Sequence, residues 1–374
     1  MKKDLEIYVL RSIRIHFAFC FVLLLAVPCS GLGQLVDCSP SSPDTDAGSC
    51  QQRESRHIVE SDLLAEHFDQ LDSKAERYRQ NKSRTSGGDW SLWQFYSELA
   101  EGQPGDERAI DYISHLERWV QQRPDSITAR VALVTGYLRW ASAGTLKTNG
   151  LYLGNNLIVH RQRIEKARVV LESSAHMSSM CPQWYWEAMM VGLSSGWDTT
   201  RIRDIFEKGI QFELGYFYLY RRYALYLWHA DQPGDLGFDS TRSVPDMGHP
   251  ELASALAKSS ADRLGGTHGD QLYFRIAAGL MTSRDPGGFA VAFGSGFPSD
   301  MLDWGRIQRG YQALATEYHI SQRTINEMAL MAWKFKDPET ARQQFAIIGG
   351  RFSSEVWGDR KRFDQARKWC GASS

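Results

Sequence analysis

Residues 110–140, IDYISHLERWVQQRPDSITARVALVTGYLRW, decide the fold class of this chain. Large apolar residues recur in the first half at three- and four-residue steps, from Ile110 to Trp119, as expected for one buried face of a helix. Pro124 then gives a stop and first-turn signal, and a second apolar helix follows up to Trp140. The segment predicts two helices joined by a short turn.

The same period recurs along the chain after residue 56. Proline and glycine separate the periodic segments, and the few alternating stretches are short and end in glycine. The sequence thus predicts an all-α protein of about a dozen helices, with inserted loops near 142–157, 231–249 and 283–300. The expected helices cover residues 63–78, 90–99, 110–120, 129–140, 161–175, 183–193, 200–212, 216–230, 251–264, 271–281, 302–318, 322–335, 339–348 and 359–369.

Small residues lie where successive helices are expected to meet. Gly136 precedes Tyr137 in one helix, Ala167 and Ala175 lie in the next, and Pro182 follows them. Small contact residues, a large residue beside them and a terminal proline are typical of TPR helix-turn-helix repeats, whose helices bury their faces only against neighbours. We predict a single domain at residues 56–374, folded as an irregular TPR-like α-α superhelix.

The aromatic and proline motifs of this region resemble a bacterial domain-of-unknown-function family of exported TPR-like helical proteins. The resemblance covers roughly residues 88–350, and the chain departs from the family pattern at 143–156 and after Trp228, where a Pro-Arg-Trp element is expected. It implies a fold, but no activity and no catalytic residues. Its motifs are Trp90-x-Leu92 with Phe95-Tyr96, Leu116-x-x-Trp119 with Pro124-x-Ser126-x-x-Ala129, Pro182-x-Trp184-Tyr185, and Trp197.

The first 33 residues have the pattern of a signal peptide. A basic start is followed by an uncharged run from Phe17 to Val27 and by small or turn-forming residues up to Gly33. This run is too short for a spanning helix of roughly 20 residues, so we expect an exported protein, periplasmic or secreted, with no stable membrane span after signal cleavage. Lipoprotein processing at Cys29 or Cys38 is the weaker alternative, because the preceding residues fit that pattern poorly.

Residues 34–55 are rich in Ser, Pro, Asp, Gly and Gln and predict a flexible polar tether. Four cysteines follow the signal peptide, and their spacing suggests a local Cys38 to Cys50 disulfide and a long-range Cys181 to Cys370 disulfide. Three pairings are possible for four cysteines, and the sequence does not choose among them.

Several classes of function find no support in the sequence. The 43 Lys and Arg balance 44 Asp and Glu, which argues against a nucleic-acid binder, since such proteins need an excess of positive charge. The histidines form no HExxH or HxH pair and the cysteines no CxxC pair, so no metal or other cofactor is expected.

Two motifs invite a catalytic interpretation. Residues 192–196, GLSSG, match the GxSxG nucleophile pattern, but they follow a helical segment instead of a strand, which favours a helix end. Glu98, Glu187 and Glu213 could supply a carboxylate pair for glycoside hydrolysis, provided that two of them approach each other in space. A third stretch, 287–297, is rich in glycine and apolar residues, and we expect a packed connection there in preference to a lid.

The densest aromatic run predicts the best candidate binding surface. On one helix these residues cover most of the circumference and cannot all face a single core stripe. They form either a ligand groove or a central helix covered by neighbours on both sides. The other tryptophans, Trp333 among them, fall in periodic helices and are expected to fill helix contacts. The candidate residues are Tyr216, Tyr218, Tyr220, Arg221, Arg222, Tyr223 and Trp228.

These observations favour a non-catalytic, exported interaction module that presents a helical surface to a protein or peptide partner. The alternative is a protein that binds or cleaves an envelope polysaccharide, because exposed aromatic faces also stack on sugars.

Overall fold

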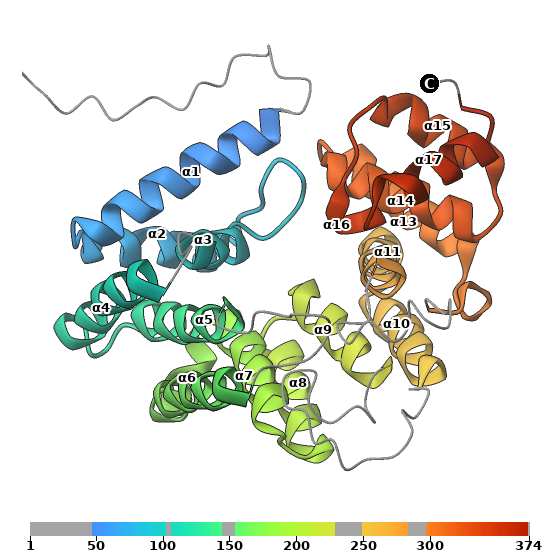
Figure 1. Cartoon of the computed structure of the whole chain (residues 1–374). Coiled ribbons are helices and arrows are strands. Elements are labelled where there is room, and N and C mark those ends of the chain that lie inside the picture. The colour runs from blue at the N-terminus through green and yellow to red at the C-terminus, as the bar shows by residue number, and fades with distance from the viewer. Residues whose placement is uncertain (1–46, 102–105, 144–153, 229–248, 283–296, 373–374) are drawn as a thin grey trace, which may run out of the picture. The chain divides into compact units, whose positions relative to one another are not determined.

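The computed structural model of the protein describes residues 47–101, 106–143, 154–228, 249–282 and 297–372 (Figure 1). Sixteen α-helices and two short 3-10 helices make up its regular structure. The described ranges contain no strand, only an isolated bridge between Arg84 and Trp90. The predicted all-helical class is therefore confirmed, although the helices are more numerous than expected.

The first six helices share one hydrophobic cluster. It contains Leu63 of α1 and Trp119 of α4, and Trp119 stacks on Phe68 with ring centroids 5.6 Å apart. In the helix pair predicted from residues 110–140, a Cβ at Gly136 would lie 2.7 Å from Leu116 Cδ1, so the glycine allows close approach. These helices are α1 (Ala47–Leu64), α2 (Phe68–Gln80), α3 (Ser91–Glu101), α4 (Asp106–Gln122), α5 (Ile127–Ala143) and α6 (Gly154–Ser173).

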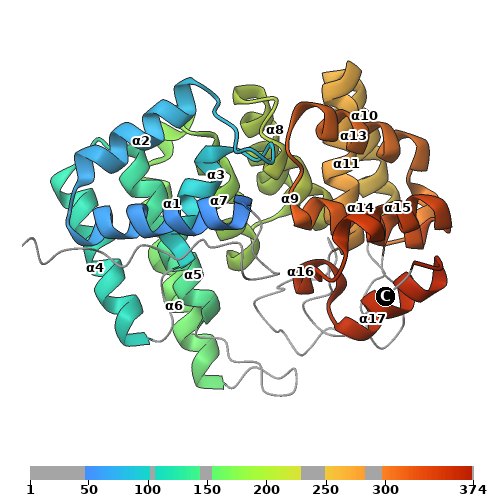
Figure 2. The same ribbon diagram turned by 90° about the horizontal axis from the view of Figure 1, so that it is seen from above.

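The middle of the chain builds a second cluster. Figure 2 shows α10, α11 and α13 beside one another, and they are in contact. A Cβ at Gly310 would lie 2.1 Å from the Asp270 carbonyl oxygen, so only glycine permits this spacing of α11 and α13. The elements are η1 (Ala175–Met180), α7 (Pro182–Ser195), α8 (Thr199–Phe212), α9 (Phe217–Trp228), α10 (Pro250–Leu264), α11 (Gly266–Thr282), η2 (Ser299–Met301) and α13 (Trp304–Glu317).

The last four helices form a third, smaller cluster around aromatic rings. Trp357 lies 5.4 Å from Phe363 and 5.7 Å from Phe345, measured between ring centroids. Side-chain N-caps begin three of the helices, each accepting a backbone N–H three residues on, and the caps are Ser321, Asp337 and Asp359. The helices are α14 (Gln322–Lys334), α15 (Pro338–Ile348), α16 (Ser354–Trp357) and α17 (Arg360–Trp369).

The structure corrects three boundaries. The end of the predicted tether, residues 47–55, belongs to α1, where Ser55 Oγ donates a hydrogen bond of 2.9 Å to Glu98 Oε2. Extending a helix from packed residues costs less than nucleating one, so polar composition did not prevent it. Residues 154–157 of a predicted loop lie in α6, and the single helix expected at 63–78 is broken at Glu66, whose φ is 57°.

Other predictions concern residues outside those described. The signal peptide at 1–33, most of the tether with Cys38, and the segments 231–248 and 287–296 are in this group. None of the helices in the described part of the chain combines the length and the apolar character needed to cross a membrane.

Candidate functional site

The seven residues predicted to form a binding surface lie on α9 or just before it. Arg221 and Arg222 are half-buried, whereas the five aromatic residues are buried, with Tyr216 and Tyr220 fully inaccessible. Helices α7, α8, α10 and α11 all contact α9. This burial favours the interpretation of α9 as a central helix over that of an open aromatic groove.

Neighbouring helices cover these rings through specific ring contacts. Tyr218 stacks on Trp93 with centroids 3.9 Å apart and planes inclined by 13°. Phe206 of α8 stacks on Tyr223 at 4.2 Å and meets Tyr220 edge-on at 5.6 Å. Rings held in this way lose their faces to other protein groups and present no surface on which a ligand could stack.

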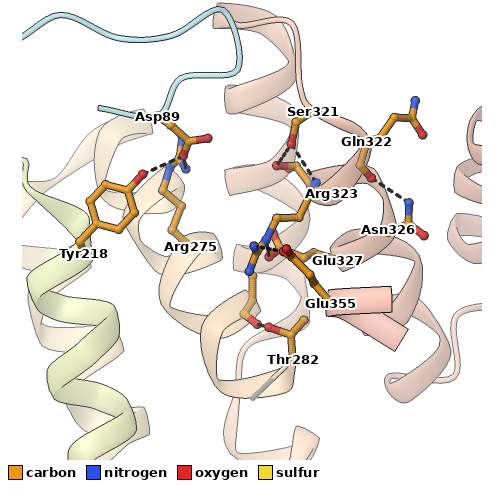
Figure 3. A network of polar contacts seen from close by, with 12 residues as sticks. Asp89, Tyr218, Arg275, Thr282, Ser321, Gln322, Arg323, Asn326, Glu327 and Glu355 are labelled. Carbon is orange, nitrogen blue, oxygen red and sulfur yellow. Dashed lines mark hydrogen bonds and ion pairs between the residues drawn. The ribbon is translucent and has the colours of Figure 1, made fainter. Parts of the chain in front are cut away.

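Polar side chains from distant segments meet at one end of α9 (Figure 3). Asp89, in the loop before α3, accepts hydrogen bonds at Oδ1 from Arg275 Nη1 of α11 at 3.0 Å and from the Tyr218 hydroxyl at 3.4 Å. Arg275 also donates to the Gly88 carbonyl at 2.9 Å. This cluster, with Arg221, Arg323 and Glu327, is called the α9 junction below.

The arginines of the α9 junction lie among carboxylates. Arg323 Nε donates to Glu327 Oε1 at 3.1 Å, and its Nη1 pairs with Glu355 of α16. Arg221 packs against Gly279, and a Cβ added at Gly279 would lie 2.6 Å from the Cγ of Arg221. Burial lowers the pKa of Arg221, and the charge of Glu327 opposes that effect. Arg275 and Arg323 of the junction are thus paired with carboxylates, whereas Arg221 forms no ion pair within the described residues.

The α9 junction fastens the loop before α3 to the middle and end of the chain. His319 donates a backbone hydrogen bond of 3.0 Å to the Ser86 carbonyl, and Trp90 Nε1 donates one of 3.0 Å to the Gly215 carbonyl. Lys82 pairs with Glu213 at 2.8 Å. These contacts hold the loop before α3 against segments from the middle and the end of the chain.

The three carboxylates considered for hydrolysis each lie in a different set of contacts. Glu98 accepts from Ser55 and Gln94, Glu187 accepts from Thr135 at 2.5 Å and Gln183 at 2.9 Å, and Glu213 pairs with Lys82. Burial raises the pKa of Glu98, and it raises the pKa of Glu187 to about 7. Because both side chains are buried, neither has the access to substrate that a general acid needs.

The GxSxG match lies at the end of a helix. Helix α7 ends at Ser195, and Gly196 follows in the left-handed conformation with φ of 69°, as a helix C-cap commonly does. The nucleophile elbow requires a strand before the serine, and here the preceding residues are helical.

The structure contradicts the predicted Cys181 to Cys370 disulfide. Both residues are free, buried thiols, and they belong to different hydrophobic clusters. Cys181 Sγ lies 3.6 Å from the Tyr96 hydroxyl, whereas Cys370 Sγ donates to the Arg367 carbonyl at 3.2 Å. An even number of cysteines permits pairing, but only the packing brings two sulfurs together. Cys38, one partner of the predicted Cys38 to Cys50 pair, lies outside the described residues.

An open surface depression of about 400 Å³ lies between the ends of α14 and α17. Its volume falls in the range of small ligand sites, roughly 300 to 1,000 Å³. Four residues line it, namely Trp333, Lys334, Lys336 and Trp369. This set is called the Trp-Lys pocket below.

The turn after α14 shapes the Trp-Lys pocket. Lys336 has a φ of 58°, and backbone hydrogen bonds from Lys336 N to Trp333 O and from Asp337 N to Ala332 O close the turn. The ring of Trp333 lies 6.2 Å from that of Trp357. Trp369 is the last residue of α17, and 42% of its surface is exposed although it is a large apolar residue.

The Trp-Lys pocket is positively charged. Burial, with a further contribution from Arg362, lowers the pKa of Lys334. Neither Lys334 nor Lys336 forms an ion pair with any residue in the described ranges. Helix α17, which carries Trp369, contains five basic residues and one acidic residue in the sequence RKRFDQARKW. Two tryptophans and two uncompensated ammonium groups therefore meet at one surface site.

The Trp-Lys pocket was not predicted from the sequence. Trp333 was expected to fill a helix contact, and Trp369 was expected only to end a helix. The available signal was the basic composition of residues 360–369 beside a terminal tryptophan. Nothing in the sequence, however, indicated that this end would lie next to the turn at Lys336.

The described residues contain no group of three or more His, Cys, Asp and Glu side chains arranged to hold a metal ion. Comparison of the chain with models of protein families, with curated proteins and with solved structures finds no match to any of them.

Proposed function

We propose that the chain is a non-catalytic, exported interaction module, and that its TPR-like helical surface binds a protein or peptide partner. The observation that carries the proposal is the Trp-Lys pocket, in which exposed aromatic surface and unpaired positive charge occur together. Tryptophan is enriched at binding hot spots because it combines a large apolar area with a polar N–H.

The helix contacts support the TPR-like part of the proposal. Most helices contact the next one along the chain, as the pairs α4 with α5, α7 with α8, α10 with α11 and α14 with α15 illustrate. In TPR-like folds such sequential pairs leave one face of the array available to a partner. The buried state of Glu98 and Glu187 supports a non-catalytic role, since these carboxyls have no access to a substrate.

Capture from a cell-envelope extract tests this function. The full chain is immobilised in three forms. One is the wild type, and the second, the pocket variant, carries Trp369→Ala and Lys336→Gln. The third, the control, carries Leu252→Ala and Lys258→Gln, which alter exposed residues of α10. We expect a protein that the wild type and the control retain and the pocket variant loses. A parallel array of envelope glycans tests the alternative, and a chain that binds glycans but no protein would overturn the proposal.

A further inference from the structure

The Trp-Lys pocket indicates the chemistry of its occupant through both of its components. In the apolar component, the ring of Trp333 lies 6.2 Å from that of Trp357 and 5.8 Å from the Arg362 guanidinium. Trp369 leaves an apolar face in water. A depression of about 400 Å³ between them is large enough for one aromatic or large aliphatic side chain with part of its backbone, and too small for a folded domain.

Within the described residues, neither lysine of the pocket forms an ion pair. The nearest acidic residue in sequence, Asp337, directs its carboxylate to other groups, because it accepts from Thr340 N, Thr340 Oγ1, Trp304 Nε1 and Gln308 Nε2 at 2.7 to 3.2 Å. Asp364 of α17 pairs instead with Arg360 at 3.0 Å. An anionic ligand would supply the compensation that Lys334 and Lys336 lack.

The backbone at Lys336 ends helix α14. Lys336 has the left-handed conformation that is common just after a helix, as Glu66 and Lys82 do, and glycine would form the same turn without the strain that a Cβ adds. Lys336→Gly therefore removes the ammonium group while the turn is preserved.

We propose that the Trp-Lys pocket binds an acidic peptide segment, with an aromatic or large aliphatic side chain between Trp333 and Trp369 and its carboxylates on Lys334 and Lys336. This inference rests on the proposed function and names its partner class. A neutral polysaccharide fits less well, because its hydroxyls carry no negative charge to balance the two ammonium groups of the lining. Charge complementarity therefore decides for the acidic peptide.

Selection from a library of random twelve-residue peptides tests the proposal and requires no assumption about the sequence of the partner. The full chain serves as bait, and peptides that also bind the Trp369→Ala variant are removed. We expect the remaining peptides to combine several Asp or Glu with one large apolar residue. The affinity of a labelled example, followed by fluorescence anisotropy, should fall at least about tenfold when its acids become Asn and Gln, and similarly when its apolar residue becomes Ser.

Variants of the chain separate binding from folding. Lys336→Gly should lower the affinity for the labelled peptide about tenfold, while the stability of the turn is unchanged or higher. Lys258→Gln, the control, should change neither the affinity nor the stability. An empty selection, a selection of neutral peptides, or affinity unchanged in Lys336→Gly would overturn the inference. Stronger binding of an acidic oligosaccharide such as a hyaluronan hexamer would overturn it as well. If the wild type and the pocket variant capture the same envelope proteins equally well, this inference fails. The proposed function would still hold in that case.

Discussion

The α9 junction and the Trp-Lys pocket are built from the same kinds of side chain and have opposite surroundings. In the α9 junction, aromatic faces stack on other rings, and Arg275 and Arg323 pair with Asp89, Glu327 and Glu355. In the Trp-Lys pocket, Trp369 remains exposed and two lysines have no ion pair among the described residues. The density of aromatic residues in a sequence therefore indicates packing, and binding capacity depends on whether other segments cover the rings.

The largest expected effect tests the burial of α9. Tyr220→Ala removes a fully buried ring that contacts Phe206 and whose hydroxyl donates to the Leu214 carbonyl at 3.0 Å. The cavity and the lost contacts should lower the free energy of unfolding by about 3 to 5 kcal/mol, measured by denaturant titration. A loss below about 1 kcal/mol would mean that α9 has an open face after all.

The next effect concerns the buried carboxyl of Glu187, on α7. Its pKa of about 7 in the folded protein exceeds the ordinary value of 4.5, so folding favours the protonated acid. The stabilising contribution is complete below pH 4.5 and is lost as the pH rises through 7. At pH 8 the ionised group should cost about 3 kcal/mol.

Glu187→Gln should therefore raise the free energy of unfolding at pH 8 and change it little at pH 5, in denaturant titrations at both values. Glu207→Gln, in an exposed position on α8, is the matched control. An equal change at both pH values would show that Glu187 does not titrate in this range and would remove the pH dependence expected for this part of the core.

A smaller effect is expected from the ion pair of the α9 junction. Asp89→Asn leaves Arg275 without its carboxylate, and Arg275 is mostly buried while Asp89 is partly exposed. We expect a loss of about 1 kcal/mol in the free energy of unfolding, together with faster hydrogen exchange in residues 84–90. Asp69→Asn breaks the more exposed pair with Arg123 and should cost less than about 0.5 kcal/mol. Equal costs for both changes would argue against a fastening role for the junction.

The smallest effect on stability should come from the Trp-Lys pocket. Trp369→Ala truncates a partly exposed ring, so the free energy of unfolding should change by less than about 1 kcal/mol in thermal or denaturant melts. The same substitution should remove peptide binding. A loss of several kcal/mol would place Trp369 in the core and would end the contrast between the two regions.

The sequence allowed much of the fold to be predicted. Hydrophobic periodicity identified the helix pair at residues 110–140, and it also indicated that the rings of α9 were too numerous for one buried face. It failed at residues 47–55, because polar composition says little about a helix that is propagated from packed neighbours. It failed again for Cys181 and Cys370, because sequence spacing carries no information on which sulfurs meet.

The sequence by itself determined that this chain is helical, since helical periodicity depends on neighbours three and four positions away. It did not identify every inward-facing residue, because Ile110, expected on the buried face that ends at Trp119, is 57% exposed. Only the tertiary structure decided which aromatic rings are covered and which charges are compensated. Trp333 and Trp369 lie on different helices, Asp89 of the loop before α3 pairs with Arg275 of α11, and Glu355 of α16 pairs with Arg323 of α14. Such contacts join segments far apart in the chain, and local periodicity does not record them.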